Sequence, residues 1–272
     1  YLLPWGQMSY WGAQVIVSLF GAIPGVGADL VEWIRGDYFI SDITLNRFFA
    51  LHVAAVPLAL VLLVVMHILA LHETGSLNPD GIEIKERKDS RGIPLDGVAF
   101  HPYYTAKDLV AIVIFFALFA AVVFFAPEMG GYFLEHANFE PANMLKTPEH
   151  IAPVWYFTPF YAILRSVPSK GWGAFLMMMA IVLLFFLPWL DRCRVKSIRY
   201  RGWTYKLALA VFIVSFVALG YLGLQPATEL VYVYAARFFA ALYFLFFLLM
   251  PLYTSAEKTR PVPERVVYDA SH

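Results

Sequence analysis

The sequence of 272 residues contains a single cysteine, Cys193. One cysteine excludes both a disulfide and a cysteine-ligated iron–sulfur cluster within this chain. Charge is also scarce, because only 15% of the residues are charged and the 20 basic side chains balance the 20 acidic ones. A net charge of zero gives no support to a global attraction for nucleic acid. The chemistry of the chain must therefore rest on other residue types.

Hydrophobic residues make up 60% of the chain, well above the share found in soluble domains. They gather in long runs, and a run of about 20 apolar residues can cross a hydrocarbon core of about 30 Å as a helix. Five runs qualify as membrane spans: Leu51–Leu71, Leu109–Pro127, Trp172–Leu190, Leu207–Leu224 and Leu230–Tyr253. The sequence therefore predicts an all-α membrane protein, a bundle of about five transmembrane helices.

Basic side chains concentrate in three of the segments outside these spans. Most Lys and Arg residues lie in 73–107, in 191–206 and in the C-terminal tail. The positive-inside rule places such segments in the cytoplasm. We therefore expect a cytoplasmic C-terminus, with His52 nearer the outer face of the membrane and His67 nearer the inner face.

Short helices are expected on the outer side. The apolar stretches 9–20 and 26–34 are too short to span and are accompanied by Trp and Tyr, which is typical of interfacial helices. The outer loop 127–171 is long, and long loops in compact proteins are usually functional. We expect a short helix within it, over Trp155–Arg165. Pro57 lies inside the first span, where it removes a backbone hydrogen bond and is expected to bend the helix.

Two histidines, His52 and His67, lie inside the first predicted span. Along an α-helix their separation corresponds to about 22 Å of rise and a net rotation of about 60°, so both rings lie toward one broad face at opposite depths. Histidine at such depth is costly unless something binds it. One explanation is that each ligates the iron of one of two stacked haems, without the CxxCH attachment that a single cysteine excludes. The alternative is that neighbouring helices or a polar cavity satisfy both imidazoles.

Motifs along nearly the whole chain resemble, in order, those of the cytochrome b family. The matching segments correspond to four parts of that family. These are the segment before the surface helices, the fourth membrane helix with the residues that follow it, the start of the next membrane helix, and the loop at the outer quinone site. The matching segments are Leu2–Ala13 (LLPWGQMSYWGA), Arg47–His52 (RFFALH), Leu71–Ser76 (LHETGS), Phe100–Asp108 (FHPYYTAKD) and Pro148–Pro168, which contains PEHIAPVWY and YAILRSVP.

The resemblance implies the membrane subunit of a bacterial ubiquinol–cytochrome c reductase, located in the inner membrane. Quinol would be oxidised at the outer face. One electron would pass to a Rieske iron–sulfur protein, and the other would pass through two b-type haems to a quinone at the inner face. The reaction would be coupled to translocation of protons. A cytochrome c-type subunit and a second copy of the complex are further implied partners. His52 and His67 would bind the haem irons. Their partner ligands lie on an earlier helix in this family, so the sequence is expected to be the C-terminal two-thirds of the subunit.

The resemblance also assigns residues to two quinone sites. Quinol oxidation would involve the first surface helix and the outer loop, at Met8, Gly12, Val15, Ile16, Pro153, Tyr156, Phe157 and Tyr161. Quinone reduction would involve His72, Lys107 and Asp108, because a carbonyl reduced by two electrons also needs two protons. Arg47 would pair with a haem propionate, or simply reach water near the helix end.

The chain departs from the family pattern at two places. Many members have a glutamate in place of Val154, proposed to accept a proton from quinol. Glu149 is the expected substitute and joins Tyr156 and Tyr161 as a catalytic candidate; the alternative is a solvated loop charge. Respiratory members also often have one residue fewer between the histidines, whereas the chloroplast-type branch has the spacing seen here. The uninterrupted chain favours the respiratory type, because the chloroplast-type complex divides this region between two polypeptides.

The expected organisation is a haem-binding part over 1–72, an inner loop over 73–107 and a C-terminal membrane domain over 108–272. Two other functions stay open. A different dihaem, quinone-linked membrane anchor would share the haem spectrum but lack the outer-loop motif. A cofactor-free, proton-coupled transporter would use the histidines as proton relays and show no visible absorbance.

Overall fold

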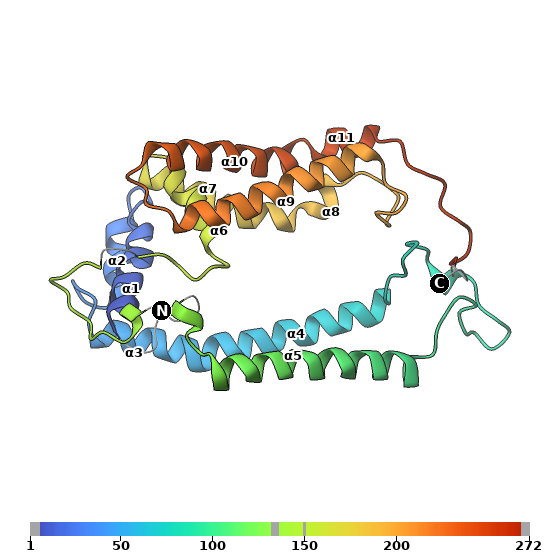
Figure 1. Ribbon diagram of the computed structural model, residues 1–272, viewed down its shortest axis with the longest axis horizontal. Coiled ribbons are helices and arrows are strands. Elements are labelled where there is room, and N and C mark those ends of the chain that lie inside the picture. Colours follow the sequence, from blue (N-terminus) through green and yellow to red (C-terminus); the bar gives the residue numbers. More distant parts are fainter. Residues whose placement is uncertain (1–5, 132–135, 149–150, 268–272) are drawn as a thin grey trace. The chain divides into compact units, whose positions relative to one another are not determined.

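The structure, a computed structural model, describes residues 6–131, 136–148 and 151–267. Over these ranges the chain forms helices joined by turns and loops, without a β-strand (Figure 1). The α-helices are α1 (Gln7–Phe20), α2 (Gly27–Arg35), α3 (Asp42–Ala50), α4 (Val56–Thr74), α5 (Thr105–Phe125), α6 (Thr158–Ser166), α7 (Lys170–Phe185), α8 (Leu187–Leu190), α9 (Trp203–Leu224), α10 (Leu230–Leu248) and α11 (Met250–Ala256). Two π-helical turns cover Leu51–Ala55 and Phe100–Tyr104, and 3-10 turns cover Ile84–Glu86, Met129–Gly131 and His136–Asn138. The predicted all-α fold is confirmed.

The chain divides into two compact units. The first is built from Tyr1–Thr74, His136–Cys193 and Trp203–Glu257, and it contains every α-helix except α5. The second is built from Gly75–Glu135, Arg194–Gly202 and Lys258–His272, and it contains α5 with the polar segments around it.

Four helical segments are long and apolar enough to cross a membrane: Asp42–Thr74, Phe100–Phe125, Trp203–Leu224 and Leu230–Leu248. They confirm four of the five predicted spans. The fifth, predicted over Trp172–Leu190, is not one helix, because α7 ends at Phe185 and α8 follows after a break. The amide of Phe186 bonds the carbonyl of Leu183, three residues back, and Pro188 has no amide with which to continue the ladder.

The predicted short helices are present. Helices α1 and α2 confirm the short helices expected over 9–20 and 26–34, whose location at the membrane interface stays a prediction. Helix α6 confirms the helix expected in the outer loop, although it begins at Thr158 rather than at Trp155. Near Pro57, where a bend is expected, the structure has the π-helical turn Leu51–Ala55, which lies directly before α4.

Helix α6 lies at the centre of the packing in the first unit. It packs against α7, α9 and α10 (Figure 1). Two glycines permit this close approach, because a Cβ atom at Gly223 of α9 would lie 2.1 Å from the carbonyl oxygen of Thr158, and one at Gly173 of α7 would lie 2.2 Å from that of Leu164. The backbone of α6 thus fills the space that side chains would otherwise occupy.

Aromatic side chains fill the interior beside α6. Phe212 of α9 stacks on Phe246 of α10 with 4.5 Å between the ring centres. Tyr243 of α10 is 1% exposed, and its hydroxyl donates a 2.8 Å hydrogen bond to the carbonyl of Ala180 in α7. This bond joins two helices inside the apolar region and satisfies the one polar atom that the Tyr243 side chain brings there.

Replacing Gly223 with alanine tests the close approach of α6 to α9. The added methyl group would overlap the Thr158 carbonyl, so we expect Gly223→Ala to destabilise the protein by about 1–3 kcal/mol. The measurement is the thermal denaturation midpoint of the purified membrane protein. Gly220→Ala is the matched control on the same helix, because a Cβ there meets its nearest neighbour at an ordinary 3.7 Å. Equal midpoints for the two variants would contradict the packing described here.

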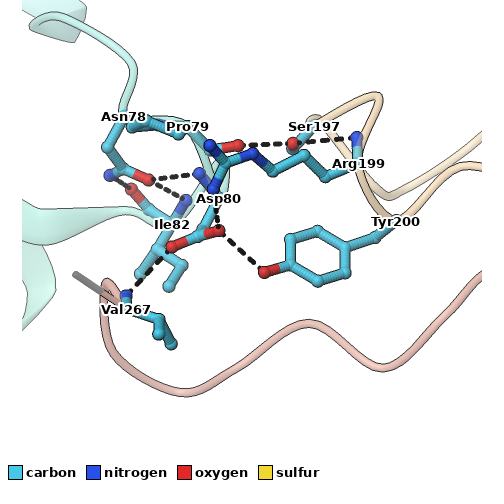
Figure 2. Close-up of polar contacts among 8 residues, drawn as sticks. All are labelled: Asn78, Pro79, Asp80, Ile82, Ser197, Arg199, Tyr200 and Val267. Atoms are coloured by element: carbon cyan, nitrogen blue, oxygen red, sulfur yellow. Dashed lines mark hydrogen bonds and ion pairs between the residues drawn. The ribbon is translucent and has the colours of Figure 1, made fainter. Parts of the chain in front are cut away.

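The second unit is organised around a buried carboxylate, that of Asp80 (Figure 2). Its side chain is fully buried and accepts hydrogen bonds from the hydroxyl of Tyr200 at 2.7 Å, the guanidinium of Arg199 at 3.3 Å and the backbone amide of Val267 at 3.0 Å. Ser197 adds a 2.5 Å bond from its hydroxyl to the carbonyl of Pro79. One carboxylate therefore joins the loop after α4, the loop before α9 and the C-terminal tail.

An ion pair between Arg265 and Asp96 also attaches the C-terminal tail. The guanidinium of Arg265 bonds the Asp96 carboxylate, with Nη2 2.8 Å from Oδ1. Hydrogen bonds from the Tyr200 hydroxyl and the Val267 amide, with the charge of Arg199, lower the pKa of Asp80, and the hydrogen bond and charge of Arg265 lower the pKa of Asp96. Both carboxylates are therefore ionised at neutral pH.

Asp80→Ala is expected to release the tail. A carboxylate whose pKa is lowered on folding stabilises the fold above its unfolded pKa of about 4 and loses that contribution as the pH falls through the folded value. The protection of the Val267 amide against hydrogen exchange should therefore persist from neutral pH to about pH 4, fall at lower pH, and be lost at every pH in Asp80→Ala. Glu83→Gln, which removes only an exposed 4.0 Å pair with Lys196, is the control and should leave that protection intact.

Candidate functional site

An apolar cavity of about 270 Å³ lies in the first unit, between α1, the segment 151–153, α6 and α7. It gathers six of the residues assigned to quinol oxidation, from two regions far apart in the sequence: Gly12, Val15, Ile16, Pro153, Phe157 and Tyr161. The phenol of Tyr161 is the one side-chain hydroxyl among the lining residues that the structure describes. The cavity can therefore hold a flat apolar ring and offer it a single side-chain hydroxyl.

Seven further residues line this cavity that the motifs did not single out. They come from α1, the outer loop, α6 and α7: Leu19, Ile151, Ala152, Phe160, Leu164, Met177 and Ile181. Leu19 follows Val15 by one helical turn, so the helical period could have added it. The contribution of α7 had no such signal, because that helix is apolar on every side.

Gln7 attaches α1 to the outer loop. Its side chain is buried, donates from Nε2 to the carbonyl of Lys146 at 2.5 Å and accepts from the amide of Asn143 at 2.7 Å, while its own amide bonds the carbonyl of Glu140 at 2.9 Å. Trp11 adds a 3.2 Å bond from its indole to the carbonyl of Asn143. These bonds hold the start of α1 against the loop segment 140–146.

Two of the predicted quinol-site residues do not line the cavity. Met8, one residue after Gln7, is 1% exposed and buried at the start of α1 instead. Tyr156 is 53% exposed, and its ring contacts Phe157 with 4.9 Å between the ring centres, so it reaches the cavity only through that neighbour. Glu149 lies outside the described residues, and its catalytic role stays a prediction.

Arg165 contacts the ring of Tyr161 and the end of α9. The Tyr161 hydroxyl donates a 3.2 Å bond to the carbonyl of Ile151, and the guanidinium carbon of Arg165 lies 4.3 Å from the centre of the Tyr161 ring. Arg165 Nη2 in turn lies 2.9–3.1 Å from the carbonyl oxygens of Leu222, Gly223 and Gln225 at the end of α9. Burial lowers the pKa of Arg165. A cation over the ring face and a carbonyl at the hydroxyl together define the orientation of Tyr161.

The two histidines of the first predicted span do not line this cavity. His52 lies in the π-helical turn before α4 and His67 in α4 itself. Both side chains are exposed on the helix surface and form no hydrogen bond with any residue that the structure describes. Imidazole nitrogens without a protein partner at two depths of an apolar helix are the donor set that haem iron needs, so these residues fit the haem hypothesis.

Arg47, one turn before the first histidine, donates a hydrogen bond to the backbone carbonyl of Trp33 at the end of α2. This bond, absent from the sequence-based expectations, ties α3 to α2. No group of three or more His, Cys, Asp or Glu side chains could hold a metal ion anywhere in the described ranges.

The residues assigned to quinone reduction fall in different units. His72 lies exposed in the last turn of α4, in the first unit. Lys107 and Asp108 lie in the first turn of α5, in the second unit, where Lys107 Nζ is 3.7 Å from Asp108 Oδ1 and 5.3 Å from the ring centre of Tyr104. Their joint role stays a prediction.

Arg165→Met is expected to loosen α6. It removes the guanidinium donor from three carbonyl oxygens at the end of α9, of which that of Leu222 keeps a bond from the Gln225 amide. It also removes the cation from the Tyr161 ring, so we expect the free energy of unfolding to fall by about 2 kcal/mol. The measurement is the thermal denaturation midpoint, which should fall by several degrees. Arg260→Met makes the same change at an exposed side chain and should leave the midpoint unchanged. A common midpoint for both variants would show that the Arg165 contacts contribute nothing.

Comparisons with known proteins cover the chain almost completely. The family described as "Cytochrome b(N-terminal)/b6/petB" matches residues 1–132, and the family described as "Cytochrome b(C-terminal)/b6/petD" matches residues 141–244. Cytochrome b of Allochromatium vinosum is 60% identical over 98% of this chain, and that of Rickettsia prowazekii is 49% identical over 97%. The chain spans 66% and 63% of the length of these two relatives.

A solved structure gives the same result in three dimensions. A chain of a "Hyperthermophilic respiratory Complex III" superposes with a TM-score of 0.84 at 38% sequence identity, covering 94% of this chain and 65% of that one. Four helices able to cross a membrane agree with this likeness. From its sequence motifs, its helical fold and its relatives, this chain is an integral membrane protein that belongs to the cytochrome b family.

Proposed function

We propose that this chain is the haem-carrying membrane subunit of a quinol–cytochrome c oxidoreductase in a bacterial inner membrane, with quinol oxidised in the outer cavity and quinone reduced near the inner face. The single observation that carries the proposal is the convergence of Gly12, Ile16, Pro153 and Tyr161 on one apolar cavity in a member of the cytochrome b family. Membership of the cytochrome b family supports the role of this chain as the haem-carrying subunit. The cavity supports the location proposed for quinol oxidation.

The histidines His52 and His67 would hold two b-type haems from one side, with the remaining ligands supplied from elsewhere in the full subunit. When bound, the haems supply one-electron carriers at two depths of the membrane. The protein would contribute one imidazole nitrogen at each depth, on a helix whose other side chains are mostly apolar. The second ring nitrogen of each histidine is available to a neighbouring helix, which would set the orientation of the ring.

The outer cavity suits a quinol for three reasons. Its apolar wall excludes water from the ring, its volume of about 270 Å³ matches a small ring system, and Tyr161 offers a hydroxyl at the wall. In the structure that hydroxyl bonds the carbonyl of Ile151 at 3.2 Å, a partner it can exchange for a quinol oxygen by a small rotation. We propose that Tyr161 orients the quinol and that Glu149 takes up one of the two protons that the quinol loses, while the other leaves to the water at the outer face.

The inner face would reduce quinone with the help of His72, Lys107 and Asp108. Reduction of a quinone by two electrons adds one proton to each of its two carbonyl oxygens, and a histidine together with a carboxylate at the water boundary can supply these two protons. Lys107 Nζ lies 3.7 Å from Asp108 Oδ1, so the two side chains lie close enough to act on one bound quinone. The positive-inside rule, applied to the basic loops, supports a cytoplasmic location for the inner face and for the C-terminus.

The proposed partners follow from the reaction. Oxidising a two-electron donor while loading one-electron carriers requires a second acceptor at the outer face, for which a Rieske iron–sulfur protein and a cytochrome c-type subunit are proposed. A dimer of the complex is proposed with them. We propose that the iron–sulfur protein contacts the outer loop, because residues 151–153 of that loop line the cavity.

Filling the cavity tests the site of quinol oxidation. In Ile16→Trp the larger side chain would occupy the cavity, and we expect kcat/KM for quinol to fall about tenfold or more, the effect of about 1.4 kcal/mol of lost binding. The assay is quinol-dependent reduction of cytochrome c by the assembled complex. Ile23→Trp is the matched control: Ile23 is similarly exposed, at 42% against 47% for Ile16, but does not line the cavity, so its activity should match the wild type.

A reduced-minus-oxidised optical spectrum of the same complex separates this function from its alternatives. The proposal requires b-type haem absorbance that appears on adding quinol. A colourless complex would instead favour the cofactor-free transporter, and haem without cavity-dependent quinol oxidation would favour a different dihaem anchor. Equal activity of the two tryptophan variants would remove the outer cavity from the mechanism.

A further inference from the structure

The helix that carries both histidines changes its hydrogen-bond pattern around His52. Residues Leu51–Ala55 form a π-helical turn, closed by a bond from the amide of Val56 to the carbonyl of Leu51. That bond joins residues five apart, whereas an α-helix joins residues four apart, so the turn contains one residue more than an α-helical turn. From Val56 to Thr74 the helix is α-helical.

Pro57 explains why the wide turn lies here. In a regular α-helix the amide of residue 57 would bond the carbonyl of Val53, but proline has no amide hydrogen and its ring clashes with that carbonyl. A wide turn just before the proline gives the carbonyl more room. The sequence thus places the extra residue within a few positions of His52 and far from His67.

The wide turn determines the direction in which His52 points relative to His67. Fifteen regular α-helical steps rotate by a net angle of about 60°. If the turn takes up one residue, fourteen steps remain, and these rotate by about 40° in the opposite sense with about 21 Å of rise. The two counts differ by about 100°, the rotation of one residue, which is enough to direct a ring toward a different neighbouring helix.

We propose that the π-helical turn Leu51–Ala55, held in place by Pro57, is a positioning element that absorbs one residue and keeps His52 in phase with His67 for haem ligation. The inference rests on the proposed function, because it concerns the direction of two haem ligands. The proposal has a specific consequence for haem binding. Removing one residue from the turn should leave both haems bound, whereas removing one residue from the α-helix beyond the turn should displace one haem ligand.

Two single-alanine deletions in the full-length subunit test this consequence. The first variant lacks Ala54, inside the turn, and carries Pro57→Ala, so that a regular α-helix with a complete hydrogen-bond ladder can form. The second lacks Ala59, inside α4, and retains Pro57 and the turn. Both shorten the distance between His52 and His67 by one residue. The proposal expects the first to keep its b-haem absorbance per assembled complex and the second to lose about half of it, since one of two sites is displaced by about 100°.

The readout is the reduced-minus-oxidised spectrum of the purified complex, with a redox titration of each haem. Unchanged midpoint potentials in the variant without Ala54 would support the proposal, because potentials respond to ligand orientation and surroundings and not to assembly alone. Loss of haem or of assembly in that variant, or full haem content in the variant without Ala59, would overturn it. A wild-type complex without b-type haem would overturn the proposed function instead, and this outcome needs no variant to be seen.

Discussion

The close approach of the α6 backbone to α7 and α9 is the constraint on which the outer cavity depends. Carbonyl oxygens of Thr158 and Leu164 lie where the side chains of Gly223 and Gly173 would otherwise begin. This contact brings a nine-residue helix deep into the first unit and fixes which of its faces is free. Ala162 and Ile163 are buried against the neighbouring helices, whereas Tyr161 is left at the cavity wall.

Two charged side chains, Arg165 and Asp80, each join several segments of the chain. Arg165 satisfies three carbonyl oxygens at the end of α9 and also lies over the Tyr161 ring, so the stability of the helix end and the orientation of the phenol depend on the same guanidinium. Asp80 has a similar place in the second unit, where one buried carboxylate joins two loops and the C-terminal tail. In an apolar setting such groups act strongly, because a lost partner leaves a buried polar atom unsatisfied.

Much of the fold could be predicted because helix length and hydropathy are local properties. Four spans, the two short helices α1 and α2 and the outer-loop helix all follow from runs of apolar residues and their breaks. The fifth predicted span is divided at Phe186, where a hydrogen bond to the residue three positions back and Pro188 interrupt an evenly apolar run that hydropathy alone describes as continuous. Motifs brought Gly12, Ile16 and Tyr161 into one predicted site, but they also included Met8, which the fold buries elsewhere.

The sequence by itself determined that the chain crosses the membrane, that two histidines lie at different depths, and that its motifs are those of cytochrome b, since each of these follows from residue type and spacing. Only the tertiary structure decided which apolar residues face the cavity. Met177 and Ile181 lie on a helix that is apolar all round, so no periodicity distinguishes the side facing α1 from the side facing lipid. Pro57 predicts a disturbance near His52, but only the structure shows that it is a π-helical turn, which alters the direction of a side chain without altering the spacing in the sequence.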